Sequence, residues 1–300
     1  MRRGEPVADL FLGVDGGGTQ CRARLADRTG RVLGEGVGGP ANIRLGLDAA
    51  FAVVLDVARQ CLAAAGLGEP AMQRIAACLA LAGATEPTEL AAARSRRLPF
   101  RHTVITSDAH AACIGAHRGR DGGVLIAGTG SVGWAIIGGR PYRVGGWGLM
   151  LSDEGSGAWL GREVMRRVLG AHDGRIASTA LLASLFEEFD RDPYAIVSWA
   201  ANARPADFGQ LAPLVVEHAT RGDAVAIELM RQAAHHLDTL AARLVALGAE
   251  RVALSGGLAP HIDGWLAPET RRHLVKPEGD ALAGALQLAR AEAAALAVEA

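Results

Sequence analysis

The chain has 300 residues, half of them hydrophobic and 21% charged, which is typical of a globular protein and excludes a disordered or fibrous one. Its formal net charge is −1, and acidic and basic residues are mixed along the whole length, so we expect neither nucleic acid nor a membrane as a partner. Because 300 residues exceed one ordinary domain, we expect two lobes of roughly 120–180 residues.

The N-terminal residues show no targeting signal. Arg2 and Arg3 are followed by Glu5 and a strand-like run, without the apolar core and small-residue cleavage site of a secretory peptide. Apolar stretches such as Ile75–Ala84 are about half the length needed to cross a bilayer. We therefore expect a cytoplasmic protein.

The first lobe opens with a β-meander. Leu10–Asp15 is an apolar strand that ends in an acid and three glycines, and Gln20–Ala26 and Val32–Gly36 have the pattern of two further strands. The next elements alternate between helical and strand-like periodicity: a helix over Leu47–Ala65, a strand over Ile75–Ala82, a helix over Glu86–Arg97 and a strand over Thr103–Thr106. This order predicts an α/β lobe that spans residues 1–117.

The same order of elements then restarts. The second series consists of a strand over Gly123–Ala127, a tight glycine turn, strands over Val132–Ile137 and Pro141–Val144, helical patterns through Leu247, a strand over Arg251–Leu254 and a closing helix over Ala281–Val298. A repeat this long indicates a duplicated domain rather than a solenoid. We predict a larger, more helical C-terminal lobe over residues 118–300, whose final helix could pack back on the N-terminal lobe.

Two glycine-rich turns occupy corresponding places in the two meanders. Asp15-Gly16-Gly17-Gly18-Thr19 follows the first strand, and Gly128-Thr129-Gly130-Ser131 follows the first strand of the repeat. Backbone N–H groups without a neighbouring Cβ can approach phosphate oxygens, and a carboxylate can manage Mg²⁺. Both turns open into a strand, so they are neither a Walker loop nor a dinucleotide fingerprint. Hairpins need glycine in any case, and it is the repetition that favours phosphate binding.

Two further segments carry polar residues where α/β proteins often bind ligands. Asp108 follows a strand and precedes the helical stretch Ala109–Ala116, so it could accept the proton of an attacking hydroxyl or cap the helix. A glycine-dense segment later in the chain carries Trp147, Asp153 and Glu154 ahead of a helix. This segment is either a surface loop or part of a binding site, because Asp and Ser also cap helices.

In the order of these motifs the chain resembles the actin-like ATPase superfamily of sugar kinases and chaperone ATPases, and within it the N-acetylglucosamine kinase and BadF/BadG/BcrA/BcrD ATPase group. The resemblance extends from Gly13 to about Ala289. It implies an α/β fold of two ribonuclease-H-like lobes with a nucleotide cleft between them, and ATP and Mg²⁺ as cofactors. The implied reaction transfers the γ-phosphoryl group to the 6-hydroxyl of N-acetylglucosamine or glucosamine. The partner is a small-molecule sugar, and association into a homodimer is compatible with the sequence.

The resemblance also implies roles for single residues. Asp108 matches the catalytic base, and Asp15 would orient Mg²⁺ through water. Residues at or near the sugar-binding positions are Asn42, Thr129, Trp147 and Asp153. The adenosine-binding region of the family matches Ser255-Gly256-Gly257 and Gly279–Ala285. The nucleotide-binding positions in this region and in the two phosphate turns are Gly16, Gly17, Gly18, Thr19, Gly128, Thr129, Gly130, Ser131, Gly256 and Gly257.

Two positions depart from the pattern of N-acetylglucosamine kinases. Ser107 and Ser152 stand where Asn and Gly are common, and Ser-Asp-Glu-Gly-Ser-Gly is more similar to bacterial glucosamine kinases. The choice between the free and the N-acetylated amine therefore stays open.

Three alternatives compete with the amino-sugar kinase. An ATPase activator of a radical acyl-CoA dehydratase or reductase would hold an iron–sulfur cluster through closely placed cysteines, but Cys21, Cys61, Cys78 and Cys113 are scattered. The scattered cysteines also do not form the Cys-rich metal loop of zinc-containing repressor/kinases, so we expect no metal besides Mg²⁺. A nucleotide-dependent binding module without substrate chemistry would not need the sugar-site residues together.

Overall fold

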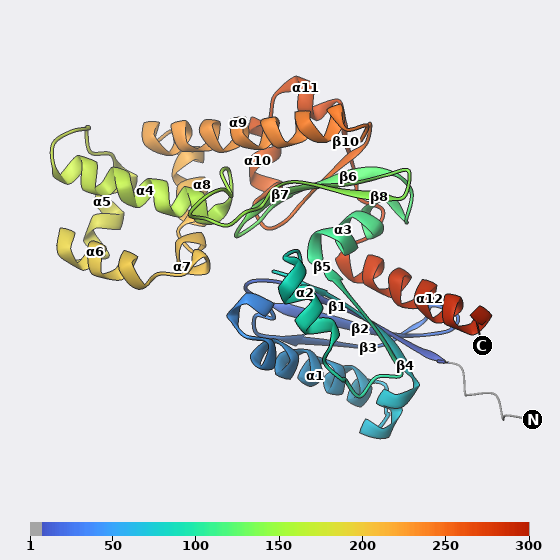
Figure 1. Cartoon of the computed structure of the whole chain (residues 1–300). Coiled ribbons are helices and arrows are strands. Elements are labelled where there is room, and N and C mark those ends of the chain that lie inside the picture. The colour runs from blue at the N-terminus through green and yellow to red at the C-terminus, as the bar shows by residue number, and fades with distance from the viewer. Residues whose placement is uncertain (1–7, 300) are drawn as a thin grey trace, which may run out of the picture. The chain divides into compact units, whose positions relative to one another are not determined.

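A computed structural model describes residues 8–299 and divides into two compact units (Figure 1). Unit 1 comprises Met1–Asp121 and Lys276–Ala300, and unit 2 comprises Gly122–Val275. Each unit has its own five-stranded sheet and its own hydrophobic core. The N-terminal residues Arg2–Glu5, where we expected no export signal, lie outside the described residues.

The sheet of unit 1 combines a meander with two parallel strands. Its strands are β1 (Leu10–Gly16), β2 (Cys21–Asp27), β3 (Val32–Gly38), β4 (Ile75–Leu81) and β5 (His102–Ser107). They lie in the order β3-β2-β1-β4-β5, with β1, β4 and β5 parallel. The last residues of the parallel strands, Gly16, Leu81 and Ser107, are in register. The segments that follow these three strands therefore start from one edge of the sheet.

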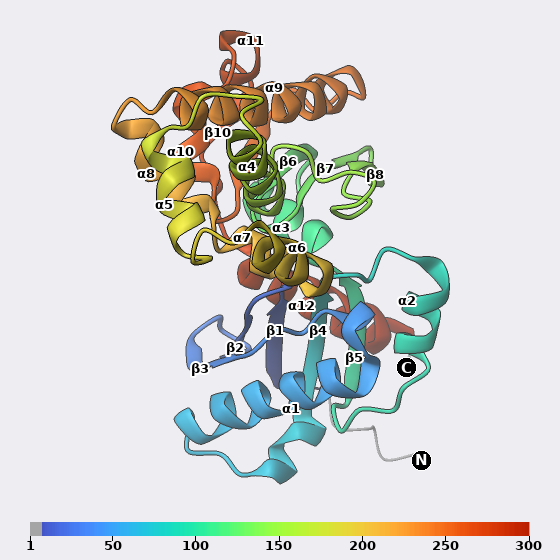
Figure 2. The same ribbon diagram turned by 90° about the vertical axis from the view of Figure 1, so that its left-hand side faces the viewer.

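Helices cover both faces of this sheet. The helical segments of unit 1 are η1 (Ile43–Leu45), α1 (Leu47–Ala64), η2 (Glu69–Arg74), α2 (Pro87–Arg94), α3 (Asp108–His117) and α12 (Ala281–Glu299). Successive side chains of a strand point to opposite faces. Accordingly Leu12 packs in the same cluster as residues of α1, whereas Phe11 packs in the cluster of α12. Figure 2 shows α1 and α12 with the sheet between them.

The closing helix is part of unit 1, the lobe on which the sequence analysis allowed it to pack, although the predicted boundary placed all of 118–300 in the C-terminal lobe. The physical reason is a set of glycines that let backbones approach. A Cβ on Gly13 would lie 2.8 Å from the carbonyl oxygen of Leu282, and one on Gly284 would lie 1.9 Å from that of Ala111. Because these positions lack a Cβ, α12 can pack closely on β1 and α3.

The sheet of unit 2 has the same strand order. Its strands are β6 (Gly122–Ala127), β7 (Ser131–Ile137), β8 (Arg140–Gly145), β9 (Val252–Ser255) and β10 (Leu274–Val275). The order is β10-β9-β6-β7-β8, in which β6, β7 and β8 form a meander and β9 and β10 run parallel to β6. The internal repeat is therefore present in the structure. The predicted elements did not include β10, which has only two residues.

Most of the helices of unit 2 lie between β8 and β9. The helical segments are α4 (Gly157–His172), α5 (Ala180–Glu187), α6 (Pro193–Asn202), α7 (Pro205–Gly209), α8 (Ala212–Thr220), α9 (Ala224–Ala246), α10 (Ala259–Ile262), η3 (Asp263–Trp265) and α11 (Pro268–Arg271). Buried side chains of α4 and α9, among them Leu160, Val164, Leu237 and Leu244, form one core with the sheet. The helices between β8 and β9 thus extend the hydrophobic core of the sheet.

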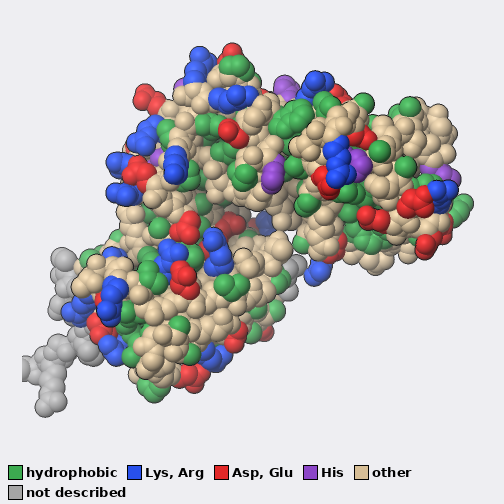
Figure 3. All heavy atoms as spheres, turned by 180° about the vertical axis from the view of Figure 1, so that it is seen from behind, with side chains coloured by type: hydrophobic (Ala, Val, Ile, Leu, Met, Phe, Trp, Pro, Cys, Tyr) green, Lys and Arg blue, Asp and Glu red, His purple; other side chains and the backbone are tan. Residues whose placement is uncertain are grey.

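Acidic and basic side chains are interspersed on the face drawn in Figure 3. Within residues 8–299, none of the helices has both the length and the apolar character needed to span a membrane.

Candidate functional site

The predicted site residues of unit 1 gather at the carboxyl edge of its parallel strands. Three backbone hydrogen bonds join the segments there: Ala82 N–H donates to Gly16 O (2.7 Å), Ala41 N–H to Gly17 O (3.1 Å) and Ile43 N–H to Ala82 O (3.1 Å). These bonds hold Asn42 between the glycine turn and the end of β4. The Asn42 Oδ1 accepts a hydrogen bond from Arg44 N at 3.0 Å.

The glycines of the first turn differ in what surrounds them. A Cβ on Gly16 would lie 2.6 Å from Leu81 Cδ2, so glycine is needed there for packing. Gly17 N–H donates to Gln20 O at 2.9 Å, which closes the turn, and Thr19 is exposed. A Cβ on Gly18 would meet no atom within 4 Å. The backbone at Gly18 is therefore open to a ligand.

Asp15 faces a residue that the sequence analysis missed. Asp15 and Arg22 are cross-strand partners in β1 and β2, and Arg22 Nη2 lies 2.6 Å from Asp15 Oδ2. The hydrogen bond that Arg22 donates to the Asp15 carboxylate raises the pKa of Arg22. The side chain of Asp15 is 17% exposed, so its carboxylate reaches solvent beside the turn. Counting residues across the Gly16–Cys21 hairpin would have identified this pair.

Asp108 is the first residue of α3, one position before the predicted start of the helix. The N-cap is Ser107, a buried residue whose Oγ accepts a hydrogen bond from His110 N at 3.1 Å. The Asp108 Oδ1 accepts from the adjacent Ala109 N at 2.8 Å. Ser107 thus provides the N-cap hydrogen bond, and the carboxylate of Asp108 accepts one from the amide next to it.

The second glycine turn, Gly128–Ser131, is bonded to the start of α4. Gly157 N–H donates to Gly128 O at 2.8 Å, and Ala158 N–H donates to Thr129 O at 3.1 Å. The hydroxyl of Ser131 is buried and donates to the carbonyl oxygen of Glu154 at 2.7 Å. The turn and the polar segment before α4 therefore form one hydrogen-bonded assembly.

Asp153 lies directly over this turn. A Cβ on Gly130 would lie 2.8 Å from Asp153 Oδ2, and Asp153 Oδ1 accepts a hydrogen bond from Gly148 N at 3.1 Å. Asp153 has φ 63°, a left-handed conformation that costs a non-glycine residue roughly 1–3 kcal/mol. Structural strain of this kind commonly occurs at ligand sites, and here it directs a carboxylate toward the turn.

Trp147 projects from the same segment and is 61% exposed. The guanidinium carbon of Arg143 lies 4.0 Å from the centroid of its ring, and Arg143 also donates to the carbonyl oxygens of Gly145 and Gly146. Arg143 is a second residue that the sequence analysis missed, because no local motif marks it. The cation stacks on the indole and leaves part of the ring accessible.

Gly256 and Gly257 follow β9 and lie beside the second turn. Gly256 has φ +99°, and a Cβ there would lie 2.3 Å from Ala127 O, so this position needs glycine. A Cβ on Gly257 would meet nothing within 4 Å, and Gly257 N lies 3.9 Å from the Cβ position of Gly128. The other half of the predicted adenosine region, Gly279–Ala285, belongs to unit 1.

The predicted residues thus form two clusters, one in each unit. Asp15, Asn42 and Asp108 belong to unit 1, and Thr129, Trp147 and Asp153 belong to unit 2; the glycine turns divide in the same way.

The four cysteines are all buried in the described structure. Burial raises the pKa of Cys21 and of Cys61 to about 12, so both thiols stay protonated. Within residues 8–299, no group of three or more His, Cys, Asp or Glu side chains is arranged to hold a metal ion.

The chain folds into two five-stranded α/β units, each with a glycine turn after its first strand. This fold is similar to that of a solved structure named as a sugar kinase. A proposed N-acetylglucosamine kinase from Chromobacterium violaceum is 34% identical, with a TM-score of 0.89 over 95% of this chain and 100% of that chain. The predicted α/β class with two lobes is confirmed.

The model of the BadF/BadG/BcrA/BcrD ATPase family matches residues 12–289, and the chain belongs to this family. The glucosamine kinase GspK of Vibrio cholerae is 40% identical over 281 residues, which cover 94% of this chain and 96% of that protein. An N-acetylmuramic acid/N-acetylglucosamine kinase of Clostridium acetobutylicum is 27% identical over 94% of this chain and 98% of that protein. The family resemblance inferred from the motifs is confirmed.

Proposed function

We propose that this protein is an ATP-dependent kinase that phosphorylates the 6-hydroxyl of an amino sugar, with glucosamine as the preferred acceptor. The observation that carries the proposal is the 40% identity to a glucosamine kinase over 94% of the chain. Proteins named for N-acetylglucosamine are less similar to this chain, at 27–34% identity, which supports the free amine.

The open backbone positions fit a nucleotide. The Cβ positions of Gly18 and Gly257 are empty, and the Cβ of Gly128 would have no neighbour closer than 3.9 Å. The phosphates of ATP would therefore lie against Gly16–Thr19 and Gly128–Ser131, with backbone N–H groups as donors, and the adenosine beside Gly256 and Gly257. Recognition of the nucleotide would depend on backbone and shape.

Asp15 fits a role in holding Mg²⁺, because hard cations prefer carboxylate oxygens and this carboxylate is partly exposed beside the turn. When bound, Mg²⁺ neutralises charge on the transferring phosphoryl group. Arg22 compensates the charge of Asp15 and adds a cation at the same edge. Asp15→Ala should therefore weaken Mg²⁺-dependent turnover, and unaltered turnover would contradict this placement.

Asp108 would act as the general base toward the sugar hydroxyl. In a loose transition state the protein aligns the nucleophile and accepts its proton late, which a carboxylate within hydrogen-bond reach does well. Asp108 is at the carboxyl edge of the sheet of unit 1, and Ser107 already caps the helix. This division of roles between Ser107 and Asp108 supports a chemical role for the Asp108 carboxylate.

The sugar would be held by Asn42 of unit 1 and by Asp153, Thr129 and Trp147 of unit 2. Asp153 is oriented by Gly148 N–H, and the exposed indole offers a flat apolar surface of the kind that sugar rings stack on. Because these residues belong to two units, we propose that sugar binding closes the units and excludes water. Closure predicts low ATP hydrolysis in the absence of sugar.

An ADP-release assay tests the function directly. Purified protein with MgATP is given glucosamine, N-acetylglucosamine, an N-acetylmuramic derivative, glucose or an acyl-CoA, and phosphorylation at the 6-position is confirmed by NMR. We expect the highest kcat/KM with glucosamine. Equal or greater turnover with glucose would contradict the amino-sugar assignment, and sugar-independent ATP hydrolysis would favour a binding module.

A further inference from the structure

The segment that carries Trp147 and Asp153 is exposed yet ordered by hydrogen bonds. Met150 and Leu151 are 86% and 84% exposed, whereas Leu149 is 6% exposed and packs in the core of unit 2. Leu151 N–H and Ser152 N–H both donate to Gly148 O, at 3.1 and 2.7 Å, which closes a tight turn. The side chain of Leu149 and this turn fix the segment from within.

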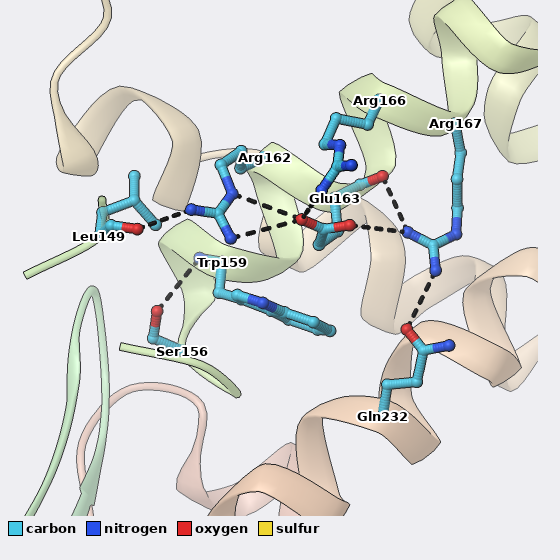
Figure 4. Close-up of polar contacts among 8 residues, drawn as sticks. All are labelled: Leu149, Ser156, Trp159, Arg162, Glu163, Arg166, Arg167 and Gln232. Carbon is cyan, nitrogen blue, oxygen red and sulfur yellow. Dashed lines mark hydrogen bonds and ion pairs between the residues drawn. The ribbon is translucent and has the colours of Figure 1, made fainter. Parts of the chain in front are cut away.

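One side chain of α4 holds the segment from outside. Arg162 Nη1 donates to the carbonyl oxygen of Leu149 at 2.6 Å (Figure 4). The same guanidinium lies 3.4 Å from Glu163 Oε1, so its orientation is set by two partners. A charged donor to a backbone carbonyl is stronger than a neutral one, and the planar guanidinium makes it directional.

Glu163 organises three arginines on this face of α4. Its side chain is 12% exposed, and its carboxylate lies 3.0 Å from Arg166 Nη1 and 3.3 Å from Arg167 Nη1. Arg167 also donates to Gln232 of α9 at 3.0 Å. Figure 4 shows that Arg162 reaches Leu149 from this cluster, whereas Arg166 contacts Glu163.

The contact at Leu149 is one residue from the backbone group that orients Asp153, the residue proposed to bind the sugar. Leu149 follows Gly148, and Gly148 N–H donates to Asp153 Oδ1 at 3.1 Å. A shift of the Leu149 carbonyl would therefore displace the donor that orients the Asp153 carboxylate. Trp147 is on the other side of Gly148 and would move with it.

We infer that Arg162 is a positioning residue for the sugar site: through the Leu149 carbonyl it fixes the backbone turn that orients Asp153 and Trp147. The inference rests on the proposed function, since it concerns the sugar-binding half of that site. Arg162 would act on the sugar and not on the nucleotide, because its hydrogen bonds are to Leu149 and Glu163.

Arg166 provides a matched control. It is on the same helix, has the same charge and pairs with the same oxygen of Glu163, but it is 71% exposed and has no contact with the segment in the described structure. The experiment compares wild type, Arg162→Ala, Arg162→Lys and Arg166→Ala as full chains. For each, the KM for glucosamine, the KM for MgATP and the melting temperature are measured.

We expect Arg162→Ala to raise the KM for glucosamine about tenfold and to change the KM for MgATP by less than about twofold. Arg162→Lys, which retains one donor for the Leu149 carbonyl, should raise the sugar KM only about threefold. Arg166→Ala should match wild type. If Arg162→Ala does not yield folded protein, Arg162→Lys decides alone: a threefold rise supports the inference and an unchanged sugar KM overturns it.

A sugar KM in Arg162→Ala equal to that in Arg166→Ala would overturn the inference, as would equal changes in both substrate constants. The proposed function has a separate outcome. If it fails, wild type transfers no phosphoryl group to any amino sugar; if only this inference fails, wild type is active and Arg162→Ala retains its sugar KM.

Discussion

The two sheets share one strand order but hold their site residues in different ways. In unit 1 the connections after β1, β4 and β5 start from Gly16, Leu81 and Ser107, which are in register, so strand pairing itself places Asp15 and Asp108. In unit 2 the corresponding turn at Gly128–Ser131 meets a long segment before α4, and side chains hold that segment in place.

This difference separates two sources of precision. Strand register is set by the hydrophobic pattern of whole strands and by their turns, so no single side chain at the sheet edge determines it. The assembly in unit 2 depends on single groups: the hydroxyl of Ser131, the carboxylate of Asp153 and the guanidinium of Arg162. Substitution of Asp108 in unit 1 should therefore affect chiefly the chemical step, whereas substitutions in the unit 2 assembly should affect the position of the substrate.

Asp108→Asn should have the largest effect. Asparagine keeps the shape and the helix start but cannot accept the proton, so we expect kcat to fall by about 10²–10⁴ with little change in nucleotide affinity. Steady-state kinetics and a nucleotide titration measure both. As a control, Ser107→Ala removes the helix cap and should cost about 1 kcal/mol of stability. Turnover of Asp108→Asn within about threefold of wild type would remove the base assignment.

Gly130→Ala tests the contact between the second turn and Asp153. The added methyl would lie 2.8 Å from Asp153 Oδ2, so the carboxylate must move, and we expect the sugar KM to rise about 10- to 100-fold. Gly264→Ala in η3 is the control, because a Cβ there meets no atom within 4 Å. A normal sugar KM in Gly130→Ala would show that Asp153 does not bind the sugar.

Ser131→Ala distinguishes the two roles open to this hydroxyl. In the structure it donates to Glu154 O, so its loss should raise the sugar KM about three- to tenfold and leave the Kd for MgATP, measured without sugar, nearly unchanged. The nucleotide-binding role predicted from the motif gives the reverse result. Calorimetric titration of MgATP into the variant decides between them.

Asp223→Asn should affect stability in a pH-dependent manner. Burial alone would raise the pKa of Asp223, but hydrogen bonds, chiefly from the backbone of Leu181, Ala226 and Val225, outweigh it and lower the pKa. A lowered carboxyl pKa stabilises the fold above the unfolded value of about 3.9, and this stability is lost as the pH falls through the folded pKa.

At neutral pH we therefore expect Asp223→Asn to be about 1–3 kcal/mol less stable than wild type in urea denaturation. The difference should narrow as the pH falls below about 4. If the difference in free energy of unfolding between wild type and Asp223→Asn stays constant across this pH range, the charge of Asp223 does not stabilise unit 2.

Local sequence patterns predicted the elements whose apolar residues follow a clear run or period. The strands β1, β4, β6 and β9 begin and end within two residues of the predicted ranges, because continuous apolar runs bounded by glycine or charged residues define buried strands. The helices α5–α8 were predicted only as one helical region, since their boundaries depend on short turns within a shared core. The two residues of β10 carry no periodic signal.

The arginines show where local reasoning ends. Arg22 could have been found by counting across the first hairpin, because cross-strand neighbours follow from register. Arg162 could not, since only folding brings the Leu149 carbonyl near it. Arg143 contacts carbonyls two and three residues along the chain, but the turn that presents them to it is not marked by any local motif. In a chain with many surface arginines, no spacing distinguishes these from solvated ones.

The sequence by itself determined the family, the repeated strand order and the two glycine turns, because these depend on short-range patterns of apolar residues, glycine and carboxylates. Only the tertiary structure decided that α12 joins unit 1, that Ser107 caps α3 in place of Asp108, and that Ser131 bonds to Glu154. Each of these depends on which backbone groups come within hydrogen-bond or packing distance, and that is set by contacts between segments distant in the chain or by competition between neighbouring side chains for one donor.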